Sequence, residues 1–221
     1  ILRTFMMTDL FSEQMASQVK LAVGAYWLRG FALPEAGLLC SVLLQHFKIH
    51  TPQQMMTPMG YKMSVRTTSF GRFGWVGAVN GYGYATKDTS TKQPWPSIPP
   101  VFLDLAQRAA SESGYVNFMP DTCLINVYEV GSKMGLHQDK DEHDFSQPIV
   151  SVSLGLPVTF QFGGLARVDK AAKVPLSHGD VVVWGGDARL CFHGVLPLKT
   201  GSHPLLGQRR INLTFRKAGK M

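Results

Sequence analysis

Cysteine is scarce in this sequence, and the cysteines it has lie far apart. There are three of them, Cys40, Cys123 and Cys191, and no two form a CxxC pair. A zinc knuckle needs closely spaced thiolates, and a disulfide framework within one chain needs an even number of cysteines. The composition therefore argues against both and favours a reducing compartment, which we expect to be the cytoplasm.

Long apolar runs are missing as well. No stretch approaches the ~20 apolar residues of a membrane-spanning helix. The N-terminal sequence ILRTFMMTDLFSEQ carries Asp9 and Glu13 and lacks the apolar core of a signal peptide. Internal repeats and linkers between domains are absent too. We therefore expect a single domain over residues 1–221 that is monomeric and has no membrane partner.

Acidic residues are outnumbered, with 15 Asp and Glu against 22 Lys and Arg and a net charge of +7. This excess favours a polyanionic partner such as a nucleic acid, although many basic proteins bind none. A glycine-rich stretch, residues 60–96, combines basic residues with aromatic ones that could stack on bases. Its aromatic residues include Tyr61, Phe70, Phe73, Trp75, Tyr82 and Tyr84.

Two stretches of the first half predict helices. LPEAGLLCSVLLQHF, residues 33–47, has Pro34 near its start, and PPVFLDLAQRAASESG, residues 99–114, also opens on proline. Both repeat apolar residues at helical spacing. We expect His46 and His50, near the end of the first helix, to lie at the surface. The expected apolar stripes are Leu38, Leu39, Val42, Leu43 and Phe47 in the first helix and Phe102, Leu105, Ala106 and Ala109 in the second.

Beyond residue 114 the sequence changes to short β-branched and aromatic segments separated by Gly, Pro and Asp. Such spacing predicts antiparallel strands in a sandwich or barrel. The fold class is therefore mainly β with flanking helices, in which residues 1–114 supply helices and an arm and residues 115–221 the β core. The segments are TCLINVYEV (122–130), PIVSVSLGL (148–156), VTFQFGG (158–164), GDVVVWGG (179–186), LCFHGVL (190–196) and RRINLTFR (209–216).

The last of these segments has one polar face. Alternate residues of a strand point to the same side, so Arg210, Asn212, Thr214 and Arg216 share a face opposite three apolar residues. If this face lines the inside of a barrel, its polar groups enclose a polar ligand. If the segment is an edge strand, the same face is simply exposed to solvent. The same alternation aligns Asn126 with Leu124 and Tyr128, and His193 with Cys191 and Val195.

The segment LHQDKDEHD, residues 136–144, is either a solvated acidic loop or part of a metal site. His137 and Asp139 are two residues apart, so an extended backbone points both at one ion. Two imidazoles and one carboxylate with open coordination positions are the ligands of non-haem Fe(II) oxygenases. The candidates for a third ligand are His143, His178, His193 and His203, of which His193 lies within a predicted strand.

An iron oxygenase also needs a source of electrons. A keto diacid that chelates the iron supplies them, and its far carboxylate calls for a planar cation. Arg210 and Arg216 are six residues apart, roughly 20 Å along an extended strand. The two arginines therefore cannot both hold one small carboxylate, but they can hold different ends of a diacid.

Four long segments, residues 124–144, 148–164, 178–195 and 209–219, resemble the bacterial type of the AlkB family of Fe(II)/2-oxoglutarate-dependent nucleic-acid dealkylases. The resemblance implies a double-stranded β-helix, or jelly roll, with an N-terminal nucleotide-recognition lid. It implies Fe(II) ligands at His137, Asp139 and His193. The 2-oxoglutarate pocket that it implies comprises Asn126, Tyr128, Arg210, Asn212 and Arg216.

The resemblance also implies the reaction, in which O2 and 2-oxoglutarate oxidise an alkyl group on a base nitrogen and formaldehyde is released. N1-methyladenine and N3-methylcytosine in single- or double-stranded DNA, or alternatively in RNA, are the implied substrates. Asp141 is then available to a base amine. The other implied substrate contacts are Trp75, stacked on the base opposite His137, Tyr82 at the phosphates, Arg167 near the base edge and Met63 in the pocket wall.

Three other interpretations remain open at the level of sequence. Trp75 could anchor its glycine-rich loop in the core rather than stack on a base. The chain could be a 2-oxoglutarate oxygenase of proteins or small molecules, which predicts no affinity for single-stranded DNA. It could also be a nucleic-acid-binding module whose barrel has lost its activity, which predicts binding without turnover.

Overall fold

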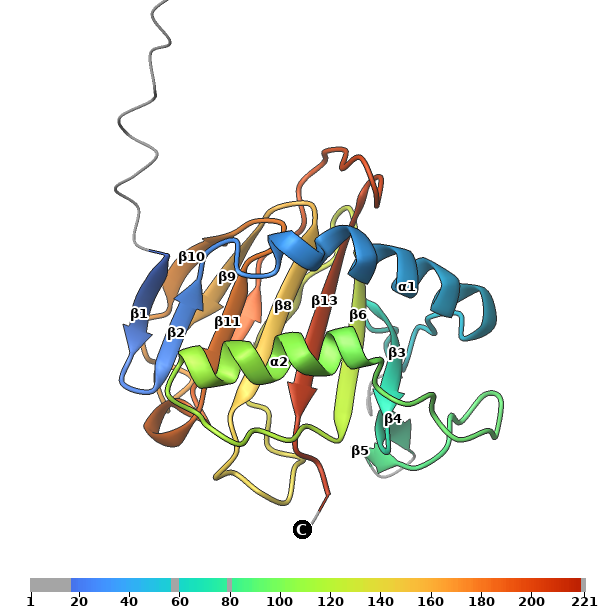
Figure 1. Cartoon of the computed structure of the whole chain (residues 1–221), viewed down its shortest axis with the longest axis horizontal. Coiled ribbons are helices and arrows are strands. Elements are labelled where there is room, and N and C mark those ends of the chain that lie inside the picture. The colour runs from blue at the N-terminus through green and yellow to red at the C-terminus, as the bar shows by residue number, and fades with distance from the viewer. Residues whose placement is uncertain (1–16, 57–59, 79–80, 220–221) are drawn as a thin grey trace, which may run out of the picture.

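Two antiparallel sheets face each other in the computed structural model, which describes residues 17–56, 60–78 and 81–219 (Figure 1). Together they form a jelly roll. The major sheet has the order β1 (Gln18–Ala22), β2 (Ala25–Leu28), β11 (Val181–Trp184), β8 (Ile149–Gly155), β13 (Arg209–Arg216), β6 (Thr122–Glu129) and β3 (Arg66–Gly71). The minor sheet has the order β10 (Ala172–Leu176), β9 (Val158–Phe162), β12 (His193–Val195) and β7 (Met134–His137).

Helices α1 (Ala36–Ile49) and α2 (Pro100–Glu112) cover the outer face of the major sheet (Figure 1). A short 3-10 turn, Leu33–Glu35, leads into α1, and a second one, Gly186–Ala188, follows β11. Both predicted helices are confirmed. The stripe of α1 is shifted from the prediction, because Leu38 is 55% exposed. The residues of α1 that are buried instead are Ala36, Leu39, Cys40, Leu43 and His46.

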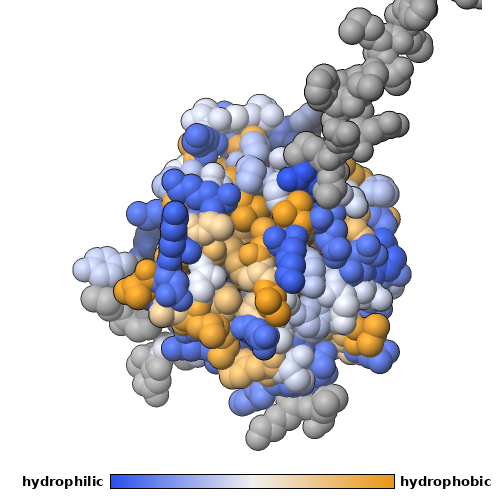
Figure 2. Space-filling view, turned by 90° about the vertical axis from the view of Figure 1, so that its left-hand side faces the viewer, coloured by the Kyte–Doolittle hydropathy of each residue, from blue (hydrophilic) through white to orange (hydrophobic). Residues whose placement is uncertain are grey.

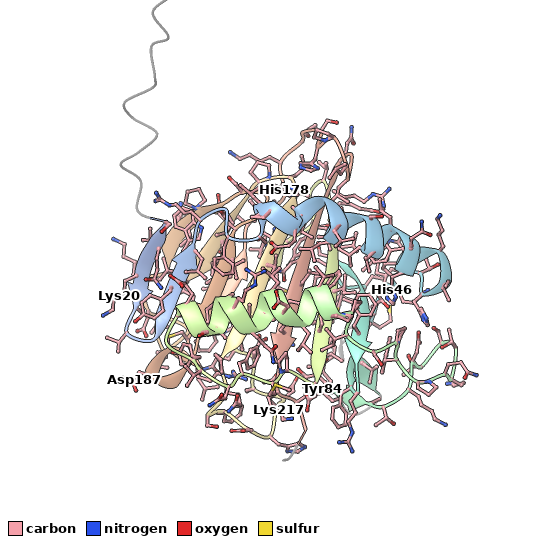
Figure 3. All side chains as sticks on the ribbon, in the orientation of Figure 1. Lys20, His46, Tyr84, His178, Asp187 and Lys217 are labelled. Atoms are coloured by element: carbon pink, nitrogen blue, oxygen red, sulfur yellow. The ribbon has the colours of Figure 1, made fainter. Side chains whose placement is uncertain are left out.

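The prediction that His46 lies at the surface is wrong. Its side chain is buried between α1 and β3, with its ring tilted against that of Phe70 and the two ring centroids 4.2 Å apart (Figure 3). Its Nε2 lies 3.3 Å from Thr68 Oγ1. Burial, together with the nearby His50, lowers the pKa of His46 to about 4, so the ring is neutral at physiological pH. Phe70, one of the aromatic residues of the 60–96 stretch, lies in the core and is not available to stack on a base.

All six segments predicted as strands form strands, namely β6, β8, β9, β11, β12 and β13. The sequence did not reveal β7, β10 or any strand before residue 115. Strands β1, β2 and β3 come from this first half and complete the major sheet on both sides. The β core therefore draws on residues on both sides of the expected boundary at residue 115. That residues 1–221 form a single domain stays a prediction.

The exposed sheet edges carry charged residues or proline. Lys20 is exposed on the edge strand β1, whose surface is shown in Figure 2, and alternates with the half-buried Val19 and Leu21. On the other sheet, the edge strand β10 contains Lys173 and Pro175. Lysine and proline on an edge oppose pairing with another chain. Among the described residues, no helix is long and apolar enough to cross a membrane.

A separate hairpin is formed by β4 (Gly74–Ala78) and β5 (Gly81–Ala85), which we call the aromatic hairpin. Trp75 pairs with Tyr84 and Gly77 with Tyr82, so the three aromatic side chains share one face. Glycines alternate with the tyrosines of β5. The opposite face lies against Trp95, whose ring would be only 2.2 Å from a Cβ at Gly74, so glycine is required there.

Candidate metal and ligand site

A cavity of ≈ 560 Å³ lies between the inner faces of the two sheets and beneath the aromatic hairpin. It is lined by the polar faces of β6 and β13, as their alternation predicts. Of the side chains that the sequence singled out, the cavity wall contains Met63, Trp75, Tyr82, Asn126, Tyr128, His137, Asp139, Asp141, His193, Arg210, Asn212 and Arg216.

Three of these residues bring possible metal ligands together. The ligand atoms of His137, Asp139 and His193 all lie within 4.8 Å of one another. Strand pairing sets this proximity, because His193 of β12 stands directly opposite His137 of β7. Asp139 follows two residues later and points its carboxylate between the two rings, 3.6 Å from His137 Nε2 and 3.7 Å from His193 Nε2.

The backbone fixes which nitrogen of each imidazole is free. Nδ1 of His137 lies 2.9 Å from the carbonyl oxygen of Gly135, and Nδ1 of His193 lies 3.1 Å from that of Cys191. A carbonyl oxygen only accepts hydrogen bonds, so Nδ1 carries the proton in both rings. Both Nε2 atoms, which lie within 3.7 Å of the Asp139 carboxylate, then carry a free lone pair, which is the tautomer that metal binding requires here.

Charge on Asp139 is maintained although the carboxylate is buried. Burial alone would raise its pKa, but Arg216 and then the two histidines pull the pKa well below its usual range. Arg216 donates from Nη2 to Asp139 Oδ2 at 2.7 Å. Burial lowers the pKa of His193 to about 4, so this imidazole is neutral at physiological pH. The set therefore offers two imidazole nitrogens and one carboxylate, which fits Fe(II) with open coordination positions.

The other candidate ligands lie elsewhere. His143 is exposed on the loop after Asp139. His178 and His203 form a separate pair with ring centroids 4.3 Å apart, and His178 Nδ1 accepts a hydrogen bond from Gly155 N. Within the described residues, the three-residue cluster above is the only group of His, Cys, Asp and Glu with metal-binding geometry.

Arg210 is a buried cation without a carboxylate partner among the described residues. It is 1% exposed, lies 4.9 Å above the Tyr128 ring and donates from Nη2 to Ser153 Oγ at 2.9 Å. Its Nε and Nη1 have no hydrogen-bond partner in the described protein. Burial lowers the pKa of Arg210, since no carboxylate offsets it. Such a group is costly unless an anion enters the cavity.

A hydrogen-bonded row on β13 and β8 holds the cavity floor in place. Asn212 Nδ2 donates to Ser151 Oγ at 2.8 Å and to the carbonyl of Val152 at 3.1 Å. Thr214 Oγ1 donates to Asn212 Oδ1 at 3.0 Å. These bonds fix the amide orientation of Asn212 without using a charged group.

Three residues next to the metal cluster, Glu142, Arg189 and Tyr84, were given no role there by the sequence analysis. Glu142 is buried and accepts hydrogen bonds from Arg189 Nη2 at 3.0 Å and from the Tyr84 hydroxyl at 2.5 Å. Arg189 also donates to the backbone carbonyl of Asp139 at 2.8 Å. Glu142 stood among four acids of the 136–144 segment, and nothing in the sequence marked it as the one that turns inward.

The aromatic hairpin covers the mouth of the cavity. Trp75 Nε1 donates to Asp141 Oδ2 at 2.9 Å, and its ring stacks on Tyr82 with centroids 4.5 Å apart. Trp75 is therefore half-exposed at the cavity and not a core anchor. Arg167, in contrast, is exposed in the loop after β9, stacked over Phe192, and does not line the cavity.

Comparison with known proteins matches this arrangement. The family model described as the 2OG-Fe(II) oxygenase superfamily matches residues 24–216. The "Alpha-ketoglutarate-dependent dioxygenase AlkB" of Escherichia coli is 52% identical over 97% of this chain and 99% of its own. The "DNA N(6)-methyladenine demethylase ALKBH1D" of Arabidopsis thaliana is 35% identical over 59% of this chain and 35% of its own. The solved structure of OsALKBH1 has a TM-score of 0.75 and 32% identity, covering 90% of this chain and 99% of that one.

Replacement of His193 by alanine should abolish tight Fe(II) binding while leaving the fold intact. Loss of groups that merely orient metal ligands already weakens binding by ~10–100-fold, so loss of a ligand should exceed ~100-fold. Anaerobic calorimetry with Fe(II) measures the affinity, and circular dichroism reports the fold. His143→Ala, on the adjacent loop, is the matched control and should bind normally. Wild-type affinity in His193→Ala would remove this residue from the ligand set.

Proposed function

The chain belongs to the 2OG-Fe(II) oxygenase superfamily, as an AlkB-type dioxygenase, and on this premise we propose that it removes alkyl groups from damaged nucleobases by oxidation. The proposed substrates are N1-methyladenine and N3-methylcytosine in DNA, with RNA as the alternative polymer. The cytoplasmic location and the monomeric state expected from the sequence belong to the same proposal.

The observation that carries the proposal is the unpartnered guanidinium of Arg210 in the cavity that also contains the metal cluster. A buried arginine whose Nε and Nη1 have no partner still has N–H donors for a carboxylate, the anion that a planar guanidinium binds best. In the proposed complex, Arg210 binds the far carboxylate of 2-oxoglutarate. Asn126, Tyr128 and Asn212 line the same wall, and Arg216 lies nearer the chelating end.

Fe(II) would be held by His137, Asp139 and His193, and with O2 and 2-oxoglutarate it supplies the oxidation of the alkyl carbon, coupled to decarboxylation of the 2-oxoglutarate. The protein positions the reactants and excludes water. The oxidised methyl group then leaves the base nitrogen as formaldehyde, and the unmodified base remains.

The cavity mouth offers groups suited to a flipped base and its phosphates. Trp75 and Tyr82 present aromatic faces, and stacking on such residues contributes ~1–3 kcal/mol per base. Three exposed lysines at the cavity, Lys62, Lys133 and Lys140, can contact the backbone phosphates. A base that pairs poorly is cheaper to flip out, which favours alkylated over intact bases.

The direct test is product release with matched oligonucleotides. With Fe(II), 2-oxoglutarate and O2, an oligonucleotide containing N1-methyladenine should yield succinate and formaldehyde in equal amounts. The same oligonucleotide without the methyl group should yield no formaldehyde. The same assay with DNA and RNA oligonucleotides of matched sequence, single-stranded and double-stranded, shows which polymer the protein prefers. Succinate release that no nucleic acid stimulates would point instead to a protein or small-molecule substrate.

Arg210→Ala should weaken 2-oxoglutarate binding far more than binding of the oligonucleotide. Removing one partner of a buried, hydrogen-bonded charge pair costs about 2–5 kcal/mol, which corresponds to at least ~30-fold in affinity. Titration of the Fe(II) protein with 2-oxoglutarate and, separately, with oligonucleotide measures both. Arg209→Ala is the control, because Arg209 is exposed on the opposite face of the same strand. An effect confined to oligonucleotide binding would show that the cosubstrate does not use Arg210.

Asp141→Asn should reduce repair of cationic lesions more than repair of neutral ones. N1-methyladenine and N3-methylcytosine carry a positive charge near neutral pH, whereas N1-methylguanine and N3-methylthymine do not. Asparagine preserves an acceptor for Trp75 Nε1 but removes the charge, so kcat/KM should fall ~5-fold more for the cationic pair. Asp144→Asn, on the same loop, should show no such preference. An equal loss for all four lesions would leave Asp141 with the sole task of positioning Trp75.

A further inference from the structure

Tyr84 connects the aromatic hairpin to the metal cluster. Its hydroxyl donates to Glu142 Oε1 at 2.5 Å and accepts from Arg216 Nη1 at 3.1 Å. Tyr84, labelled in Figure 3, lies on β5. Glu142 lies in the loop after β7, and Arg216 lies on β13. One hydroxyl thus links three segments of the chain. Glu142 is 58 residues and Arg216 is 132 residues from Tyr84 in the sequence.

Beyond Tyr84 the links continue to the metal ligand. Arg216 Nη2 donates to Asp139 Oδ2 at 2.7 Å, and its Nε lies 3.5 Å from Glu142 Oε1. Arg189 completes the group by donating to Glu142 at 3.0 Å. Two guanidinium groups therefore face two carboxylates, and all four side chains are at most 8% exposed. The two positive and two negative charges of this cluster balance, and the Tyr84 hydroxyl is the group through which the hairpin contacts it.

Among the aromatic residues of the hairpin, Tyr84 differs from its neighbours. Trp75 bonds to the exposed Asp141, and Tyr82 stacks on Trp75, so both of these contacts remain at the half-exposed mouth. The Tyr84 hydroxyl instead bonds to two buried charged groups, and hydrogen bonds to charged groups are the stronger kind. Tyr84 is therefore the member of the hairpin that reaches the interior.

We propose that Tyr84 is a positioning residue that fastens the aromatic hairpin to the Glu142–Arg216 pair, so that closure over the base and the orientation of Arg216 on Asp139 depend on each other. This inference rests on the proposed function, since it assigns a role in the same site. Tyr84 does not touch the reacting atoms. It acts through Arg216, which fixes the carboxylate of the metal ligand, and through the hairpin, which carries Trp75.

The first test measures the hairpin itself and needs no turnover. Tyr84→Phe keeps the ring and removes only the hydroxyl, so the fold should be retained. Hydrogen exchange of the backbone amides of residues 81–85 should become at least ~10-fold faster, since two charge-assisted hydrogen bonds are lost. Tyr115→Phe is the matched control, because the Tyr115 hydroxyl donates to Gly24 O at 2.7 Å, far from the hairpin in the sequence. Equal exchange in both variants and the wild type would overturn the proposal.

The second test measures coupling, which a purely structural role would leave unchanged. The ratio of 2-oxoglutarate consumed to base repaired should rise at least ~3-fold in Tyr84→Phe, because the base and Arg216 are no longer held together. The KM for the oligonucleotide should rise more than kcat falls. Tyr115→Phe should keep the wild-type ratio. A wild-type ratio in Tyr84→Phe would also overturn the proposal.

The third test asks whether Tyr84 acts through Glu142. Glu142→Gln retains the shape and one acceptor oxygen but removes the charge. If the two residues act as one unit, the double variant Tyr84→Phe, Glu142→Gln should couple no worse than Glu142→Gln alone. Multiplied effects in the double variant would refute the linkage. If the wild type repairs no base at all, the proposed function fails, whereas the hydrogen-exchange result still decides whether Tyr84 fastens the hairpin.

Discussion

The contact between Arg216 and Asp139 is the interaction on which the site depends. A carboxylate that is 8% exposed would ordinarily take up a proton, and a protonated acid is a poor metal ligand. Arg216 keeps Asp139 ionised, and Glu142 and Arg189 in turn balance and orient the guanidinium. Because removing one member of a buried ion pair leaves its partner uncompensated, the four side chains are constrained as a group.

Alternation along single strands made much of this predictable. Strand β13 has Arg210, Asn212, Thr214 and Arg216 on the cavity side and Ile211, Leu213 and Phe215 against the helices, so one strand shows both the core and the ligand wall. The two-residue spacing of His137 and Asp139 could be predicted for the same reason, because it lies within one short segment. The third ligand, His193, could be ranked from its predicted strand, but its partnership with His137 became visible only in the pairing of β7 with β12.

The features that the sequence did not reveal depend on distant partners. Strands β1 to β5 are short, and all but β2 are rich in glycine or polar residues, so they become strands because the major sheet and Trp95 offer them neighbours. His46 is buried because β3 supplies Thr68 and Phe70, which no helical period can indicate. Tyr84 and Glu142 are 58 residues apart, so neither stood out among the nearby tyrosines and acids.

The direct opposition of His193 and His137 across two paired strands has a consequence for how the site can change. Ladder hydrogen bonds, rather than loop conformation, set the separation of the two imidazoles. Insertions or deletions in the turns between β8, β9, β10 and β11 would therefore leave the ligand spacing intact, whereas a slip of one residue between β7 and β12 would direct one imidazole to the opposite face. The spacing of the metal ligands therefore depends on the alignment of β7 with β12 and not on the lengths of these turns.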